Sequence, residues 1–333
     1  MTDIGSNKMP ERNAKKIYQA LRAARNVLIV PHQNPDGDAL GSACVLIHLL
    51  KKWNINHTVF CATDKADNLS FLPHVDRITT NAGIWDNHAF DLIVVVDSSD
   101  LTYAGVSKYI EELSPRPTII NIDHHVTNEN YGDLNLVIKT AASTTQILYN
   151  FFKINNIKID KHTATCLLTG LITDTDNFTN SATTVSSLTI ASDLINRGGN
   201  IKLIKDIIFK NKTVNSLKLW GQVFSRLEKH DTHEIVYTYI TKKDLKKHKV
   251  DMEEAEGIAN FMNNLSDGKA ALILKEREDG TIKGSFRTTK EDVDVSIIAK
   301  KLGGGGHKKA AGFEVKGTIE EALEKVWKAI ENK

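Results

Sequence analysis

Asp123, His124 and His125 have the clearest chemical potential in the chain, because two imidazoles beside an acid directly follow the apolar run PTIINI. Three more acidic or histidine-containing segments lie in the same half of the chain. They are His32-x-x-x-Asp36-x-Asp38, Asp97 at the end of DLIVVVD, and Asp174 in GLITDTDNF. Imidazole and carboxylate ligands together suit Mn²⁺, Mg²⁺, Co²⁺ or Zn²⁺, and an excess of carboxylates favours the harder ions. These segments hold enough ligands for two divalent ions, so the sequence predicts a two-metal hydrolase of phosphate esters.

Each segment also has a purely structural interpretation. The run NPDG around Asp36 has the composition of an ordinary turn whose acid caps the following helix. Asp97 is equally suited to cap a helix, and two adjacent histidines are compatible with a solvent-exposed pair. Asp174 is less readily explained in this way, since an acid is unfavourable at the negative C-terminal end of a helix.

Hydrophobic periodicity predicts that strands and helices alternate through this half of the chain. Short apolar runs indicate buried strands over 27–31, 57–62, 92–97 and 117–123. Helical spacing, with a capping-box pattern at Ser143 and Gln146, indicates helices over 14–25, 39–52, 143–153 and 161–172. The alternation predicts an α/β fold with a doubly wound, mainly parallel sheet. Ligands bind beyond the carboxyl ends of such strands, where three of the four segments are expected to lie.

Two domains are expected, because 333 residues are many for a single one. The run RGGN marks the end of the first, so residues 1–200 are predicted to form a catalytic metal-binding domain. Residues 201–229 are predicted to form a helical linker. The second, smaller α+β domain is expected over 230–333, with strands at 233–240, 271–277 and 282–289 and helices at 253–264 and 294–302.

Composition excludes several classes of protein. The formal net charge is +2, which favours neither a strong nucleic-acid binder nor a membrane-surface protein. No run of about 18 apolar residues suggests a membrane span, and the first residues lack the apolar core of a secretory signal. Cys44, Cys61 and Cys166 are predicted to be buried thiols in a reducing compartment. A cytoplasmic location is therefore expected.

The segment GGGGHKKAAG at 303–312 is a further chemical signal. It is not a Walker loop, because no Gly-Lys-Ser/Thr follows. Gly304, Gly305 and Gly306 permit close approach of the backbone to a ligand, and His307 offers a donor to an anion. Arg287, on a predicted strand, is suited to bind a phosphate with two hydrogen bonds. The alternative interpretation of the glycines is a C-cap of the preceding helix.

The segments in this order resemble the DHH phosphoesterase superfamily. HQNPDGDALGSA, the strand ending in Asp97, the DHH triplet and TDTDNF match the N-terminal pattern of that superfamily. GGGGHKKAAGF resembles the glycine-histidine motif of its DHH-associated C-terminal domain. The resemblance spans roughly residues 15–333, and within the superfamily the chain resembles the bifunctional oligoribonuclease/pAp phosphatase type, also called nano-RNases.

The resemblance implies a role for each of these residues and two divalent ions, which are expected to be Mn²⁺, with Mg²⁺ or Co²⁺ as alternatives. One ion is implied at His32, Asp36 and Asp97. The other is implied at Asp38, Asp97, His124 and Asp174, so that Asp97 bridges the two. His125 is implied near the scissile phosphate, with Asp123 supporting the site from behind. The second domain is implied to hold the nucleotide through Arg287, Gly304, Gly305, Gly306 and His307.

The activity implied is hydrolysis of short oligoribonucleotides or dinucleotides to mononucleotides, and of pAp to AMP. The alternatives are a phosphodiesterase for cyclic di-AMP or pApA, a single-strand exonuclease, and a catalytically silent nucleotide-binding protein. One departure from the family pattern is visible in Asp176-Asn177-Phe178-Thr179, which keeps the aromatic residue but lacks the basic one. A homodimer is compatible with the sequence.

Overall fold

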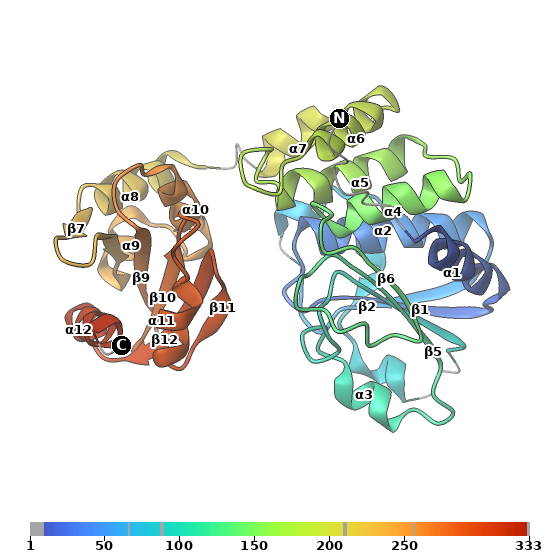
Figure 1. The fold of residues 1–333 in the computed structure, drawn as a ribbon, viewed down its shortest axis with the longest axis horizontal. Helices are drawn as coiled ribbons and strands as arrows, with labels where there is room; N and C mark the ends of the chain where they lie inside the picture. Colours follow the sequence, from blue (N-terminus) through green and yellow to red (C-terminus); the bar gives the residue numbers. More distant parts are fainter. Residues whose placement is uncertain (1–9, 66, 87–89, 209–211, 256, 332–333) are drawn as a thin grey trace. The chain divides into compact units, whose positions relative to one another are not determined.

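The computed structural model describes residues 10–331 except 66, 87–89, 209–211 and 256. The chain divides into two compact units, Met1–Lys210 and Asn211–Lys333, and Figure 1 shows the elements of each. Among the described residues, no helix has both the length and the apolar character needed to cross a membrane. The three cysteines are free and buried, as predicted.

The first unit is built on a parallel sheet of six strands in the order β3-β2-β1-β4-β5-β6. All pairings in this sheet are parallel, which confirms the predicted α/β class. The strands are β1 (Asn26–Pro31), β2 (Asn56–Phe60), β3 (Ile78–Thr79), β4 (Leu92–Val96), β5 (Thr118–Asp123) and β6 (Leu134–Val137). The short strands β3 and β6 were not predicted, because neither has a long apolar run to mark it.

Helices cover both faces of this sheet, because successive residues of a strand point to opposite sides. Val94 packs in a core with α1, α2, α4 and α5, whereas Val95 packs in a second core with Ile110 of α3. The helices of the unit are α1 (Glu11–Ala23), α2 (Gly37–Lys52), α3 (Ser107–Glu112), α4 (Thr144–Ile154), α5 (Lys161–Asp174), α6 (Val185–Asn196) and α7 (Ile201–Ile208). The sheet is therefore doubly wound, as expected.

The ends of α4 and α5 differ in detail from the sequence pattern. Ser143 caps α4 by accepting a hydrogen bond from the Gln146 N–H (3.0 Å). The Gln146 side chain accepts from the Ala142 N–H instead of completing a capping box. Helix α5 continues two residues beyond its predicted end, so Asp174 is its last residue. Three successive residues with positive φ, from Asp176 to Phe178, then prevent the helix from continuing.

The second unit has a mixed sheet in the order β11-β12-β10-β9-β8-β7. Its strands β8 and β9 pair in parallel and its other pairings are antiparallel. The strands are β7 (Glu228–His230), β8 (Ile235–Ile240), β9 (Ala270–Glu276), β10 (Thr281–Arg287), β11 (Gly305–His307) and β12 (Ala310–Lys316). The helices are α8 (Val214–Phe224), α9 (Lys242–His248), α10 (Ile258–Phe261), α11 (Val295–Lys301) and α12 (Ile319–Glu331).

Two segments have a structure that differs from the one the sequence predicts. The single helix predicted over 253–264 is wrong: short 3-10 turns at Glu253–Ala255 and Met262–Asn264 flank the four-residue helix α10. Gly257, with a φ of 93°, interrupts the helical backbone between them. The segment 201–229, predicted to be a linker, contains α7 in the first unit and α8 in the second. The domain limits 1–200 and 230–333 stay predictions.

Candidate metal centre

The carboxyl ends of β1, β4 and β5 place most of the candidate ligands of the first unit. His32 follows β1 directly, Asp97 follows β4, and His124 follows β5. These strands are neighbours in the parallel sheet, so their carboxyl ends meet at one edge. The carboxylates of α2 and α5 reach the same edge, because Asp36 and Asp38 lie at the start of α2 and Asp174 lies at the end of α5.

His32, Asp36 and Asp97 form one group of potential metal ligands. The His32 Nε2 atom lies 3.7 Å from Asp36 Oδ1 and 3.6 Å from Asp97 Oδ2. The His32 Nδ1 atom lies 2.7 Å from the Gln33 carbonyl oxygen, which can only accept, so Nδ1 carries a proton. In the neutral form of the ring, the lone pair of Nε2 is directed toward the two carboxylates, as in a metal-ligating histidine.

Asp38, His124 and Asp174 form a second group. The His124 Nε2 atom lies 3.1 Å from Asp174 Oδ2 and 3.5 Å from Asp97 Oδ1. Asp97 is thus close to both groups, with one carboxylate oxygen toward each. The structure brings all six predicted ligands together at one end of the sheet.

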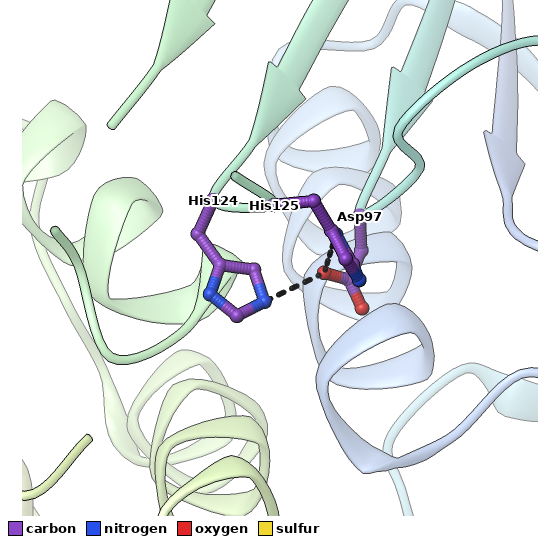
Figure 2. Close-up of side chains that lie close together, drawn as sticks. All are labelled: Asp97, His124 and His125. Carbon is purple, nitrogen blue, oxygen red and sulfur yellow. Dashed lines mark ion pairs between the residues drawn. The ribbon is translucent and has the colours of Figure 1, made fainter. Parts of the chain in front are cut away.

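Figure 2 shows His124 and His125 both turned toward the Asp97 carboxylate. Adjacent residues of an extended chain face apart, so the sequence predicts one imidazole on a metal and the other toward the substrate. The two rings lie 4.8 Å apart between centroids, closer than the alternation of a strand would place them. The reason is that β5 ends at Asp123, so the alternation of a strand does not extend to the histidines.

Asp123 is fully buried and lies behind His125. Its Oδ1 atom is 2.7 Å from His125 Nδ1, and its Oδ2 atom accepts a hydrogen bond from Asn128 Nδ2 at 2.7 Å. Burial acts to raise the pKa of Asp123, but hydrogen bonds from His125 and Asn128 outweigh it and hold this pKa below its usual value. An ionised Asp123 therefore accepts a hydrogen bond from His125 Nδ1–H, which leaves Nε2 as the second functional nitrogen of the ring.

The first turn of α4 fixes Asp38. The backbone N–H groups of Thr144 and Thr145 donate to its two carboxylate oxygens at 2.6 and 2.9 Å. The Thr144 hydroxyl donates to Asp97 Oδ1 at 2.9 Å. A helix N-terminus favours negative charge, so α4 supports two acids of the centre at once.

The electrostatics of the centre favour a bound cation. Burial raises the pKa of Asp97 well above its usual range, and the nearby carboxylates of Asp38 and Asp36 raise it further. Burial and the charge of Asp38 raise the pKa of Asp174 to about 8. Burial acts to lower the pKa of His124, but its hydrogen bond to Asp174 outweighs this effect and raises it to about 9. A bound cation would offset the burial and the mutual repulsion that raise the pKa values of these acids.

The donor set fits divalent cations. Ligand atoms that share one ion at about 2.0–2.3 Å lie roughly 3–4 Å apart, which is the spacing of His32 and His124 from the carboxylates. An oxygen-rich set with one imidazole in each group is typical of hard or borderline ions. The residues present are therefore able to hold two divalent ions that share Asp97.

The candidate binding residues of the second unit lie at one end of its sheet. Arg287 pairs across the sheet with Ala310, which in turn pairs with His307, so the three share one row. The side chain of His307 lies outside the described part of the structure. Arg287 Nη1 donates to the Phe286 carbonyl oxygen at 2.9 Å, and burial lowers the pKa of this guanidinium.

The glycine run is a short strand rather than a loop. Gly305 and Gly306 belong to β11, which pairs with β12. A Cβ atom at Gly304 or Gly306 would collide with the backbone of β12, whereas one at Gly305 would meet open space. At Gly304 and Gly306 the backbone therefore lies close to the neighbouring strand β12, where the sequence predicted close approach to a ligand. Of the three glycines, only Gly305 has open space beside it.

Sequence reasoning missed three residues that shape the centre. Thr144 was considered only as part of a helix start, and Asn128 had no motif around it. Tyr103 carries no signal in the sequence, yet its ring stacks on that of His32 with centroids 4.9 Å apart. Thr144 and Tyr103 were hidden because their partners lie far away along the chain, whereas Asn128 lies near Asp123 in a loop that has no recognisable pattern. Phe178, whose neighbours depart from the family pattern, packs against the core of the first unit.

The fold and the site together define a class of protein. Its members have two units and, at the edge of a parallel sheet, a candidate metal centre whose ligand groups meet at one carboxylate. The family model described as DHH family, N-terminal domain, matches residues 26–171, and that of the DHHA1 domain matches residues 233–332. The chain belongs to the DHH family of phosphoesterases and carries its DHHA1 domain.

Known proteins of this family resemble the chain over nearly its whole length. The bifunctional oligoribonuclease and PAP phosphatase NrnA of Thermus thermophilus is 28% identical, over 94% of this chain and 92% of the relative. The cyclic-di-AMP phosphodiesterase GdpP of Geobacillus thermodenitrificans is 27% identical, over 98% of this chain but only 51% of that protein. The crystal structure of an exopolyphosphatase-related protein from Bacteroides fragilis shares the fold, with a TM-score of 0.88 at 24% identity, over 99% of this chain and 98% of that one.

Proposed function

We propose that this protein hydrolyses short oligoribonucleotides and dinucleotides to mononucleotides, and pAp to AMP. The observation that carries the proposal is the place of Asp97, which belongs to the ligand group of His32 and Asp36 and lies 3.5 Å from His124 of the other group. Two cations held by one carboxylate form the arrangement that stabilises an in-line displacement at phosphorus. The NrnA relative, which matches over nearly the full length of both chains, supports the choice of substrate.

Manganese is our proposal for both ions, because the set combines imidazole with an excess of carboxylate oxygens. When bound, the ions would lower the pKa of water and neutralise charge on the phosphoryl oxygens. His32, Asp36 and Asp97 would hold one ion, and Asp38, Asp97, His124 and Asp174 the other. Asp97 has the central role because its two oxygens face the two groups.

His125 is proposed to move a proton at the leaving group. Its Nδ1 atom is engaged by Asp123 at 2.7 Å, so Nε2 is the atom free to face a substrate. The buried Asp123 carboxylate stabilises the charged imidazolium and holds the ring in one orientation, in the way that an acid supports a general acid–base histidine. Asn128 in turn holds Asp123 through its side-chain amide.

The second unit is proposed to bind the nucleotide. Arg287, Gly304, Gly305, Gly306 and His307 are the residues assigned to this role. Arg287 and the glycine strand lie at the same end of one sheet, which supports a shared task. Gly305 is the open position among the glycines, so backbone contact with a ligand is most accessible there.

Hydrolysis of cyclic di-AMP or of its linear product pApA is the second candidate function. The GdpP relative supports it, although this chain spans about half the length of that protein. A cytoplasmic location accompanies either proposal, since three free buried thiols suit a reducing compartment. A homodimer stays a prediction.

The deciding experiment is an activity panel with Mn²⁺. The substrates are RNA of two to ten nucleotides, pAp, pApA, cyclic di-AMP and pyrophosphate, and each is also tested with a chelator in place of the metal. An Asp97→Asn preparation made in parallel reports contaminating nuclease. We expect the shortest RNAs and pAp to be cleaved fastest. Nucleotide binding without hydrolysis of any member would reject the proposal in favour of a silent binding protein.

A further inference from the structure

Tyr103 places an exposed aromatic ring beside the candidate metal centre. It lies in the loop after β4, and 40% of its surface is exposed. One side of the ring stacks on the His32 imidazole, with centroids 4.9 Å apart and an interplanar angle of 27°. An edge-to-face contact at 6.1 Å joins it to His125. The phenol ring therefore touches a candidate metal ligand and the candidate proton donor at the same time.

Hydrogen bonds hold the backbone of Tyr103 in position, and the stack on His32 holds its ring. The Tyr103 N–H donates to Asp100 Oδ1 at 2.7 Å, and its carbonyl accepts from the Gln33 N–H at 3.2 Å. The same loop is tied to the loop after β5, because Asn128 and Tyr131 both donate to the Ser98 carbonyl at 3.1 Å. A ring fixed in this way loses little conformational entropy when it contacts a ligand.

The Tyr103 ring is suited to contact a flat apolar group, because 40% of the residue is exposed beside the candidate metal centre. The acids and imidazoles of the centre would contact the phosphate and the ions. They therefore leave the uncharged base of a nucleotide to be contacted by another side chain. Aromatic side chains supply that contact for bases, because every base has a π-face.

We propose that Tyr103 is a substrate-contacting residue whose ring stacks against a nucleobase of the substrate and so makes the enzyme select nucleotides over other phosphate esters. This inference rests on the proposed function in assuming a nucleotide as the substrate. It assigns recognition of the base to Tyr103 in the first unit, and this role is independent of any contacts that the second unit makes with the nucleotide.

Two ligands that differ only in the base test this role directly. Binding of AMP and of ribose 5-phosphate is measured by calorimetry with Mn²⁺ present, in wild type, Tyr103→Phe, Tyr103→Leu and Tyr103→Ala. Wild type and Tyr103→Phe should prefer AMP, and Tyr103→Ala should reduce this preference roughly tenfold. Tyr103→Leu keeps the bulk of the side chain without its π-face and should resemble Tyr103→Ala. Ribose 5-phosphate affinity and bound metal should change little in any variant.

The outcomes separate this inference from the proposed function. An unchanged AMP preference in Tyr103→Ala would overturn the stacking role, and so would an equal loss of affinity for both ligands, which would mean that the ring only supports the metal centre. Steady-state kinetics on a dinucleotide add a second readout, in which Tyr103→Ala should raise KM more than it lowers kcat. If wild type cleaves no nucleotide but the AMP preference depends on Tyr103, the proposed activity fails and the stacking role stands.

Discussion

Asp97 is the residue on which the centre depends most. It adopts a φ of 59°, a left-handed conformation that costs a non-glycine residue about 1 kcal/mol, although aspartate tolerates it better than most. The Asp97 N–H donates to the Ile122 carbonyl oxygen at 3.0 Å and the Thr144 hydroxyl donates to its side chain. These bonds hold the carboxylate between the two ligand groups.

Replacing Asp97 with asparagine should abolish most turnover while leaving the fold intact. Asparagine keeps the size and tolerates the left-handed backbone, but it removes the charge that both groups share. We expect turnover to fall at least about a hundredfold and metal occupancy to fall with it. The metal-free variant should melt no lower than wild type, since asparagine removes the acid whose ionisation burial and the neighbouring carboxylates oppose. Near-normal turnover, with metal content measured on the same sample, would refute the shared role.

Metal binding should release protons near neutral pH. In the metal-free protein, burial and the charge of Asp38 raise the pKa of Asp174 to about 8, so this acid is largely protonated at pH 7. A cation must displace that proton, and affinity for Mn²⁺ should therefore weaken as pH falls below about 8. Calorimetric titrations at pH 7 in two buffers of different ionisation enthalpy measure the protons released. Identical heats in both buffers would contradict the raised pKa.

Helices α2, α4 and α5 are the elements that assemble the second ligand group. Asp38 lies in the first turn of α2, Asp174 ends α5, and the first N–H groups of α4 hold Asp38. Gly170 of α5 faces Asp38 and Thr145 so closely that a Cβ atom there would collide with both side chains. A glycine in mid-helix thus brings three helices near enough to share one carboxylate.

A Gly170→Ala substitution should damage both stability and metal binding. The added methyl group must displace Asp38 or Thr145, and overpacking of this kind costs about 1–3 kcal/mol. Gly221→Ala in α8 is the matched control, because a Cβ atom there meets nothing within 4 Å. This control should gain about 0.5–1 kcal/mol from better helix propensity. Denaturant melts and Mn²⁺ titrations compare the two, and similar behaviour would show that the contact at Gly170 is unimportant.

The whole molecule consists of two units that each have their own hydrophobic cores. Two clusters of buried residues lie in the first unit and two in the second, and among the described residues none of the four draws members from both units. A segment with its own core is expected to unfold as a separate cooperative unit. The candidate ligands all lie in the first unit.

Calorimetric unfolding should therefore show two transitions, of which Mn²⁺ moves one. Metal at a hundred times its Kd stabilises the unit that binds it by about 2.7 kcal/mol, which corresponds to roughly 5–10 °C in Tm for a unit of this size. The transition of the second unit should stay in place and serve as the internal control. A chelator should reverse the shift. Equal movement of both transitions would argue against independent units.

The order of strands and helices in the first unit could be predicted because each element carries its own local pattern. The apolar run at Leu92–Val96 and the helical spacing in Gly37–Lys52 are examples, and both elements lie close to their predicted bounds. The second half was harder. β11 consists of glycine and histidine and has no apolar pattern, and the break at Gly257 depends on a positive φ that a helical pattern does not reveal.

The sequence by itself determined the kind of chemistry: which acids and imidazoles follow the strands, that they suit divalent cations, and which family shares this order of motifs. Only the tertiary structure decided which side chains meet. Asp123 supports His125 rather than His124, the start of α4 holds Asp38 from 106 residues away, and Tyr103 stacks on His32. The physical reason is that periodicity and residue type are local properties of the chain, whereas side-chain distances depend on how distant helices and loops pack.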